Sequence, residues 1–474
     1  MKRSKPTLSV SFVAVVLVAF LALYGNGCMV GPNYRRPQVS TPPAYRGDDG
    51  KTSPAASQSG ASLGDLKWHE VFQDPVLQNL IQTALKQNYD LQIAATRILQ
   101  AEAQLGVTRS QQFPQVNGTA SGVRQKTAAE YSLRRLHREY VSIGRKCLLD
   151  AGLLGTVPAG NRGGASLSAG LAVRAGSGES DPGFRAGEQL FPTAGARSGL
   201  KDFAGHVEVA AGLLAADRDQ GAGRGVLHPD VRQAESLVET AQTTITDTER
   251  SIKQTEDAIS TFLGQNPGSI ARGKPLDDIA LEPMLPAGMP SALLERRPDI
   301  RQAEEQLVAA NAEIGVARAA FFPQIALTGS GGAESFQLSK LFTSGIWSYA
   351  GDLSQPIFTA GRLKANLRLA STHRDEAVLT YKKTIQEAFR EVSDALIGYE
   401  QNRQFLAEQQ TLTKTLADAD QLSRVRYQGG VTSYLEVLQQ ETQYFSSQLG
   451  LAQTRLSEFT SVVQLYQALG GGWQ

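Results

Sequence analysis

Few side chains in this sequence are of the types that catalyse reactions or bind metals. No two histidines stand three or four residues apart, the spacing that places two zinc ligands on one face of a helix. The histidines are His69, His137, His206, His228 and His373. No glycine-rich phosphate loop occurs, and we interpret Gly470–Gly472 as a terminal tail. The sequence therefore predicts a protein that is not an enzyme and needs no metal or cofactor.

The cysteine that suggests chemistry is Cys28. A basic start with Lys2, Arg3 and Lys5 precedes an apolar run, Leu8 to Leu23, that is short for a membrane-spanning helix. Small residues then lead into Cys28, which favours a lipoprotein signal over residues 1–27 and a lipid on the cysteine. The alternative is an ordinary exported protein with an incidental cysteine. Cys147 lies in an irregular stretch, and we assign it no redox role.

Composition narrows the class of partner. The formal net charge is +1, so the chain has no excess of basic residues for binding nucleic acid. Two cysteines exclude a disulfide-rich scaffold. No later stretch has the roughly 20 apolar residues of a transmembrane helix. If the chain crosses a membrane, we expect it to do so with strands.

The chain repeats itself at long range, which indicates two structural halves. Phe113-Pro114-Gln115 recurs as Phe322-Pro323-Gln324 at an offset of 209 residues. A second pair, PDVRQAESLVETAQ from Pro229 and LEVLQQETQYFSSQ from Leu435, is offset by 206 residues. Each half therefore contains a helix that changes into a strand, followed later by a helical arm.

The last arm is a long helical hairpin. Apolar residues recur at helical spacing from Gly361 to Tyr427, a length of roughly 100 Å at 1.5 Å per residue. Gly429-Gly430 ends this helix, Thr432 or Ser433 can cap the next one, and the return helix runs to about Leu469. A coiled-coil rod without a channel would also fit this pattern alone.

The strands begin where helices meet proline, at Pro114 and Pro323. After Pro323, Ile325, Leu327 and Gly329 alternate with smaller or polar residues. The stretch IWSYAGDLSQPIF likewise places Trp347 and Tyr349 on one face and small polar residues on the other. An apolar aromatic face opposite a polar one suits a membrane strand beside a wet lumen. Two hairpins give four strands, too few to close a barrel, so several chains must share one.

The chain resembles the TolC-type outer membrane efflux proteins, in the lipoprotein branch that serves multidrug pumps. The resemblance covers nearly all of residues 28–130 and 230–474. Its motifs are CMVGPNYRRP from Cys28, WHEVFQDPVLQNLIQTALKQNYDLQIAATRI from Trp68, LLERRPDIRQAEEQLVAANAEIGVARAAFFPQIALTG from Leu293, QPIFTAGRLKANL from Gln355 and RYQGGVTSYLEVLQQE from Arg426.

The resemblance implies an α+β membrane protein whose long antiparallel helical hairpins form an α-barrel. Each of three identical subunits would add four strands to a shared twelve-strand β-barrel. It further implies a passive exit channel for drugs or other small molecules, anchored in outer membrane lipid and extending into the periplasm. Its partners would be a periplasmic adaptor protein and an inner membrane efflux pump, with no nucleic acid. A type I secretion channel and a periplasmic coiled-coil lipoprotein stay open as alternatives.

By position, the periplasmic tip and gate lie between Tyr427 and Tyr434. The gate residues that the resemblance implies are Tyr427, Gly429, Gly430, Val431, Thr432 and Tyr434. Some family members place an acidic residue just after the Gly-Val of this tip, where this chain has Thr432. Asp418 and Asp420, a few turns above, either face the tunnel or lie on a solvated outer face.

These patterns divide the chain into six segments. Residues 1–27 are the signal peptide, and residues 28–130 hold an equatorial segment, the first long helix and the first strand. Residues 131–229 are anomalous and leave no second strand or first tip hairpin that can be read. The remaining segments are a helical arm, linker and long helix (230–320), the second β-hairpin (321–360), and the periplasmic hairpin with the C-terminal equatorial segment (361–474).

The anomalous segment suggests a change of reading frame. Residues 131–230 hold 18 of the 46 glycines but one Ile and one Asn, a composition that breaks helices. With allowed codons and the first base dropped, the stretch from Gly152 to Ser166 can read Asp-Phe-Trp-Gly-Arg-Tyr, which is like the family's sequence. We hypothesise compensating frame changes near Ser132 and Pro229, with loss of a sealed channel. A genuine low-complexity insertion is the alternative.

Overall fold

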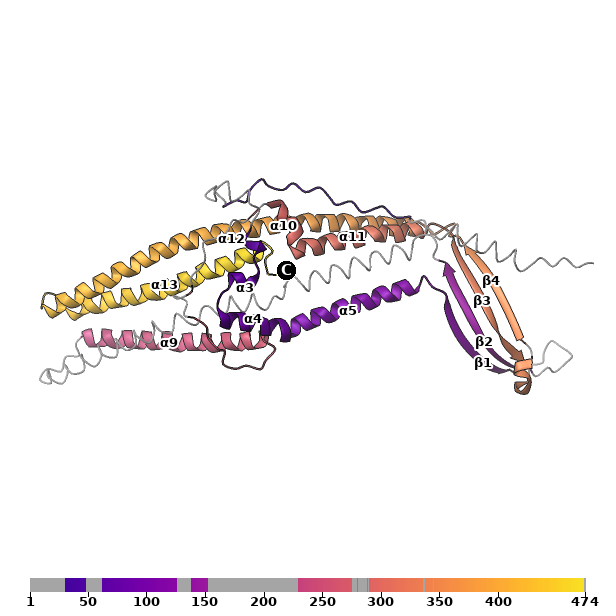
Figure 1. The fold of residues 1–474 in the computed structure, drawn as a ribbon, viewed down its shortest axis with the longest axis horizontal. Coiled ribbons are helices and arrows are strands. Elements are labelled where there is room, and N and C mark those ends of the chain that lie inside the picture. Colours follow the sequence, from indigo (N-terminus) through magenta and orange to yellow (C-terminus); the bar gives the residue numbers. More distant parts are fainter. Residues whose placement is uncertain are drawn as a thin grey trace, which may run out of the picture. The chain divides into compact units, whose positions relative to one another are not determined.

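The computed structural model describes residues 30–47, 62–125, 138–151, 229–274, 279, 288, 290–335, 337–343 and 345–472. The chain forms two units (Figure 1). Unit 1 comprises Met1–Gln38, Thr96–Ala172 and Gln302–Lys382, and unit 2 comprises Val39–Ala95, Val173–Arg301 and Lys383–Gln474. None of the described helices has a stretch that is both long and apolar enough to span a membrane.

Unit 1 contains a four-stranded antiparallel sheet in the order β1-β2-β3-β4 (Figure 1). Its strands are β1 (Gln115–Gln125), β2 (Arg138–Ala151), β3 (Gln324–Ser335) and β4 (Gly345–Ser354). A 3-10 helix, η3 (Leu338–Thr343), connects β3 to β4. The prediction of four strands in two hairpins is confirmed. Within the described residues, β1 and β4 each pair on one side only, so both edges of the sheet are open.

The expectation that residues 131–229 leave no second strand is wrong, because β2 lies in that segment. It pairs along β1 from Gln125↔Arg138 to Gln115↔Leu148, and along β3 from Val141↔Ser335 to Ala151↔Ile325. The physical reason is that neighbouring strands supply partners on both sides, and this stretch contains Val141 and Ile143, which favour strands. The other part of the segment, residues 152–228, lies outside the described residues.

The two faces of the β3–β4 hairpin differ as predicted. Trp347 pairs with Gly331 and Tyr349 with Gly329, so each large ring stands opposite a residue without a side chain. The two rings stack with centroids 5.7 Å apart and are 76% and 81% exposed. On the other face, the hydroxyls of Ser330 and Ser348 lie 2.7 Å apart in a hydrogen bond. An exposed aromatic face and a small polar face therefore share one sheet.

The two helix-to-strand junctions have the same geometry. Helix α5 (Tyr89–Ser110) ends before Pro114 and β1, and α11 (Pro298–Ala319) ends before Pro323 and β3. In both, the residue before the proline closes a final turn: Phe113 N–H donates to the Ser110 carbonyl and Phe322 N–H to the Ala319 carbonyl, each over 3.1 Å. The repeat read from the sequence is therefore present in three dimensions, and both prolines stand at the change of period.

Helix α12 (Arg362–Gln428) begins in unit 1 and continues into unit 2, where α13 (Tyr434–Ala468) follows it as the second arm of a hairpin (Figure 1). The predicted apolar stripe of α12 is buried at Ile385, Ala388 and Val392. Its Phe389 is half-buried and contacts the ring of Tyr45. Gly398 does not interrupt the helix. The predicted hairpin and its bounds are thus confirmed to within one or two residues.

The other elements of unit 2 are shorter helices and one further arm. They are η1 (Leu63–Asp65), α3 (Trp68–Val71), α4 (Pro75–Gln87), α9 (Pro229–Phe262) and α10 (Pro290–Arg296). Ala84 of α4, Ile259 of α9 and Leu263 just after α9 form a small core. Gly264 after α9 and Gly470 after α13 both adopt positive φ, 69° and 77°. The two arms therefore end in the same glycine turn, as their repeat predicts.

Candidate functional site

The tip of the α12–α13 hairpin is a tight turn built by two glycines. Gly430 adopts φ 70°, donates its N–H to the Tyr427 carbonyl over 2.9 Å, and is followed by Val431, whose N–H reaches the Arg426 carbonyl over 2.9 Å. This pair of hydrogen bonds is a Schellman motif, which satisfies the last carbonyls of α12. Val431 is left highly exposed at the turn. The predicted tip residues therefore lie together, with a hydrophobic side chain at the apex.

Polar contacts tie the turn to the start of α13. Thr432 Oγ1 donates to Glu436, and Arg426 Nη1 lies 2.5 Å from Glu436 Oε1. Ser433 occupies the N-cap position of α13, but its side chain accepts no capping hydrogen bond. Thr432 thus orients the carboxylate of Glu436. Glu436 is the acidic side chain that sequence reasoning missed at this turn.

The aromatic rings of the tip face each other across the hairpin. The centroids of Tyr427 on α12 and Tyr434 on α13 are 5.1 Å apart, with planes inclined at 60°. Burial is the main cause of a raised pKa for the Tyr434 hydroxyl, and the negative charge of Glu441 adds to it. Tyr434 therefore stays a neutral hydrogen-bonding group at physiological pH.

A partly buried ion cluster lies close to the tip, with buried carboxylates on Asp420 and Glu441 and an Arg424 side chain that is 44% exposed. Arg424 Nε donates to Asp420 Oδ2 over 3.0 Å, and Arg424 Nη2 reaches Glu441 Oε1 over 2.8 Å, which joins α12 to α13. Burial lowers the pKa of Arg424, but the two carboxylates outweigh it and the pKa is raised overall. Asp420 Oδ1 is buried without a hydrogen-bond partner among the described residues.

This cluster corrects one of the two interpretations of the upper acidic pair. Asp420 is 9% exposed and lies between the helices of its own hairpin, so it is not on a solvated outer face. Asp418 is exposed, two residues away on another side of α12. The reason is the helical period: residues two apart point about 200° apart around the axis. Only Asp420 can meet Arg424 one turn later.

In unit 1, residues 30–38 form a strap along helices α11 and α12. Asn311 Nδ2 donates to the Pro32 carbonyl over 2.9 Å, and the Tyr34 hydroxyl donates to Glu304 over 3.0 Å. Arg36 bridges the helices, with Nη2 2.8 Å from Glu304 and Nε donating to the Tyr381 hydroxyl over 3.1 Å. The strap therefore fastens residues 30–38 to both helices.

The strap was not predicted from the sequence, since its partners are hundreds of residues away. Close backbone packing fixes the N-terminal end of the strap: a Cβ added to Gly31 would lie 3.0 Å from the Cα of Gly315. Burial raises the pKa of the Tyr34 hydroxyl, and the hydrogen bond to Glu304 raises it further. Cys28, the predicted lipid site, precedes the strap and lies outside the described residues. Among the described residues, no group of acidic, histidine and cysteine side chains could hold a metal ion.

Comparisons with known proteins agree with this architecture. The sequence model of the outer membrane efflux protein family matches residues 80–143 and 289–471. The chain is 36% identical to the toluene efflux pump outer membrane protein TtgI of Pseudomonas putida over 478 residues, 96% of this chain and 98% of that protein. It is 32% identical to the cation efflux system protein CusC of Escherichia coli over 469 residues, 96% of this chain and 98% of that protein.

Solved structures of outer membrane channels have the same fold as this chain. The structure superposes on the open state of the Neisseria gonorrhoeae MtrE outer membrane channel with a TM-score of 0.84 and 30% identity, covering 94% of this chain and 99% of that chain. CusC superposes with a TM-score of 0.81 at 28% identity, covering 94% of this chain and 100% of that one. On the family match, the identities and the shared fold together, the chain belongs to the outer membrane efflux protein family.

Proposed function

We propose that this chain is the outer-membrane exit channel of a tripartite efflux system and exports drugs or other small molecules. The observation that carries the proposal is the sheet of unit 1, with an exposed aromatic face, a small polar face and two open edges. Open edges leave unpaired backbone groups, which cannot remain in lipid. Three copies side by side would pair every edge and make a twelve-strand barrel. Transport through it is passive conduction.

The partners follow from the position of the tip. We propose that a periplasmic adaptor protein and an inner membrane pump meet the trimer where α12 turns into α13. The exposed Val431 and the Glu436 cluster are the groups available there. Relatives support this assignment through their names, which describe outer membrane proteins of toluene and solvent efflux pumps. Substrate selection belongs to the pump in this scheme, so the channel itself needs no specific binding pocket.

We also propose that Cys28 carries a lipid in the outer membrane. Gly31 packs against Gly315, and three residues of chain span at most about 10 Å. Helix α11 ends at Ala319, four residues after Gly315, which is about 6 Å along its axis. A lipid on Cys28 can therefore reach the level at which α11 gives way to β3, the level where this proposal puts the membrane surface.

Residues 152–228 are expected to prevent conduction by the chain as written. We propose that two compensating frame changes, near Ser132 and near Pro229, replaced the first helical hairpin. The glycine-rich composition of residues 152–228 supports this, because it opposes long helices. The repeat in α9 supports a return to the original reading frame near Pro229.

A complementation experiment tests both the function and the frame change. The host lacks its own efflux exit channel and expresses the adaptor and pump of the toluene efflux system. A chimera in which residues 152–228 are replaced by the matching segment of TtgI should restore resistance, and the chain as written should not. A chimera that reaches the outer membrane without restoring resistance would refute the function. Restoration by the unaltered chain would refute the frame change.

A further inference from the structure

Both helix-to-strand junctions of unit 1 carry an arginine four residues before an exposed phenylalanine. Arg109 lies in the last turn of α5, and Arg318 lies in the last turn of α11. Phe113 and Phe322 follow them after the helices end, and the junction proline comes next in each case. Both arginines are exposed, and the two phenylalanines are 68% and 41% exposed. The internal repeat therefore duplicates a pairing of one cation and one aromatic ring at the base of two strands.

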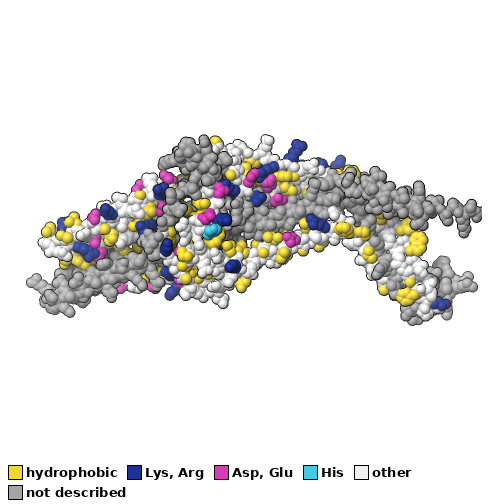
Figure 2. Space-filling model, viewed as in Figure 1, with side chains coloured by type: hydrophobic (Ala, Val, Ile, Leu, Met, Phe, Trp, Pro, Cys, Tyr) yellow, Lys and Arg dark blue, Asp and Glu magenta, His cyan; other side chains and the backbone are white. Residues whose placement is uncertain are grey.

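A third connection, from β4 into α12, has the same composition. Ile357 and Phe358 are 95% and 88% exposed, values that large apolar side chains rarely have in water. Arg362 and Lys364 follow within one or two turns, and both are exposed. The first turn of α12 contains no acidic residue. Figure 2 shows hydrophobic side chains, in yellow, on the strand region of unit 1.

The sequence around these junctions has no negative charge. Asp and Glu are absent from residues 103–129, 314–333 and 353–374. Arg109, Arg318, Arg362 and Lys364 all lie in these windows, and none of them forms an ion pair with a described residue. Elsewhere on the described helices, exposed cations often have a carboxylate one turn away, as Lys383 has Glu387 and Arg390 has Asp394. Cations without carboxylate partners attract an external anion.

We propose that these residues form a collar that binds the phosphate groups of anionic phospholipids in the periplasmic leaflet of the outer membrane. The collar consists of Phe113, Phe322, Ile357 and Phe358 with Arg109, Arg318, Arg362 and Lys364. Aromatic rings settle at the boundary between headgroups and acyl chains, and cations beside them meet the phosphates. The inference rests on the proposed outer-membrane location and adds the lipid class that the junction selects.

Charge complementarity favours lipid over a second copy of the chain as the occupant. A neighbouring subunit presents the same acid-free windows at this level, so it brings cations to cations. The exposed apolar groups alone would suit a protein contact, but the repeated arginines would then repel one another. Anionic headgroups remove that repulsion and leave the rings in contact with acyl chains.

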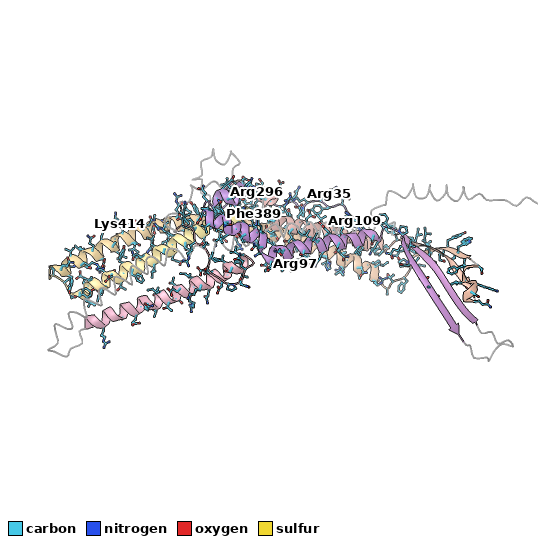
Figure 3. All side chains as sticks on the ribbon, turned by 60° about the horizontal axis from the view of Figure 1, so that its bottom comes forward. Arg35, Arg97, Arg109, Arg296, Phe389 and Lys414 are labelled. Atoms are coloured by element: carbon cyan, nitrogen blue, oxygen red, sulfur yellow. The ribbon has the colours of Figure 1, made fainter. Side chains whose placement is uncertain are left out.

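The test compares four substitutions with four matched ones in the full chain. The collar variant is R109Q/R318Q/R362Q/K364Q, and the control is K86Q/R97Q/K253Q/K414Q, which removes the same charge at exposed cations outside the three windows. Figure 3 labels Arg109 near the strand end of α5, Arg97 further back on the same helix, and Lys414 on α12. Native mass spectrometry then counts phosphatidylglycerol and phosphatidylcholine retained by protein extracted from mixed vesicles.

The unsubstituted chain and the control should retain phosphatidylglycerol preferentially, and the collar variant should lose that preference by on the order of tenfold. A third variant, R109K/R318K/R362K, keeps the charge and should keep the preference, which separates lost charge from lost folding. Equal preference in the collar variant and the control would overturn the collar alone. If the unsubstituted chain does not fractionate with the outer membrane, the proposed function fails, and the collar fails with it.

Discussion

At the scale of residues, the tip hairpin depends on one arginine that joins two helices. Arg424 forms ion pairs with Asp420 on its own helix and with Glu441 on α13. The Glu441 side chain is only 7% exposed. From the sequence, Asp420 was assigned a tunnel or surface role, because the contact of its partner Arg424 with Glu441 on α13 joins residues 17 positions apart. Pairing across a hairpin depends on how the helices rotate against each other, which a single-chain pattern does not give.

Removing the charge of Glu441 should loosen the tip. In Glu441→Gln, the exposed Arg424 side chain loses a charge-assisted hydrogen bond to a buried carboxylate, a cost of roughly 1–3 kcal/mol. We expect hydrogen exchange at the backbone of the tip to become about tenfold faster or more, as measured by mass spectrometry. The control is Glu387→Gln, which breaks the exposed pair with Lys383 and should change little. Equal exchange in both variants would contradict the role of the cluster.

Cys28 is a second prediction at this scale. Cys28→Ser should abolish incorporation of labelled palmitate, because the thiol is the site to which the lipid is attached. The variant should still fractionate with the outer membrane, since the strands and the strap do not depend on the lipid. Label that persists in the serine variant would show that the lipid lies elsewhere or is absent.

At the scale of elements, the sequence predicted the parts that local patterns control. Pro114 and Pro323 mark the ends of helices, the alternation around Trp347 identifies a strand and its faces, and Gly429-Gly430 places the tip. Strand β2 was missed because its pairing with β1 and β3 outweighs a weak local signal. The strap was missed because the partners of Tyr34 and Arg36 lie far away along the chain, so no local pattern indicates these contacts.

The glycine turn that ends α9 gives a test of element packing. Gly264 has positive φ, and an added Cβ would lie 2.4 Å from the Gln87 carbonyl oxygen. Gly264→Ala should therefore destabilise unit 2 by about 2 kcal/mol or more, through both the left-handed backbone and the clash. Thermal unfolding in detergent measures the effect.

The matched control is Gly106→Ala in α5, where an added Cβ meets nothing within 4 Å. Alanine in a helix is favoured over glycine by about 0.5–1 kcal/mol, so this variant should be as stable as the parent or slightly more so. If both alanine variants unfold alike, the close packing of Gly264 on α4 is not what stabilises the turn.

At the scale of the whole molecule, a four-stranded sheet with two open edges must pair with strands from other chains if it is to span a membrane. Their number and their faces follow from the sequence, but the number of copies follows from closing the barrel: bacterial barrels begin at eight strands, and three chains supply twelve. The related channels whose structures superpose on this chain have the same fold over nearly all of their length. We therefore expect this chain to work as a trimer in the outer membrane.

The most direct measurement is the native mass of the protein extracted from outer membranes in mild detergent. We expect a complex of three chains of 50.9 kDa, less the signal peptide and plus any bound lipid. The sheet lies outside residues 152–228, so the chain as written should trimerise even where it does not conduct. A monomer or a dimer in the outer membrane fraction would contradict a shared twelve-strand barrel.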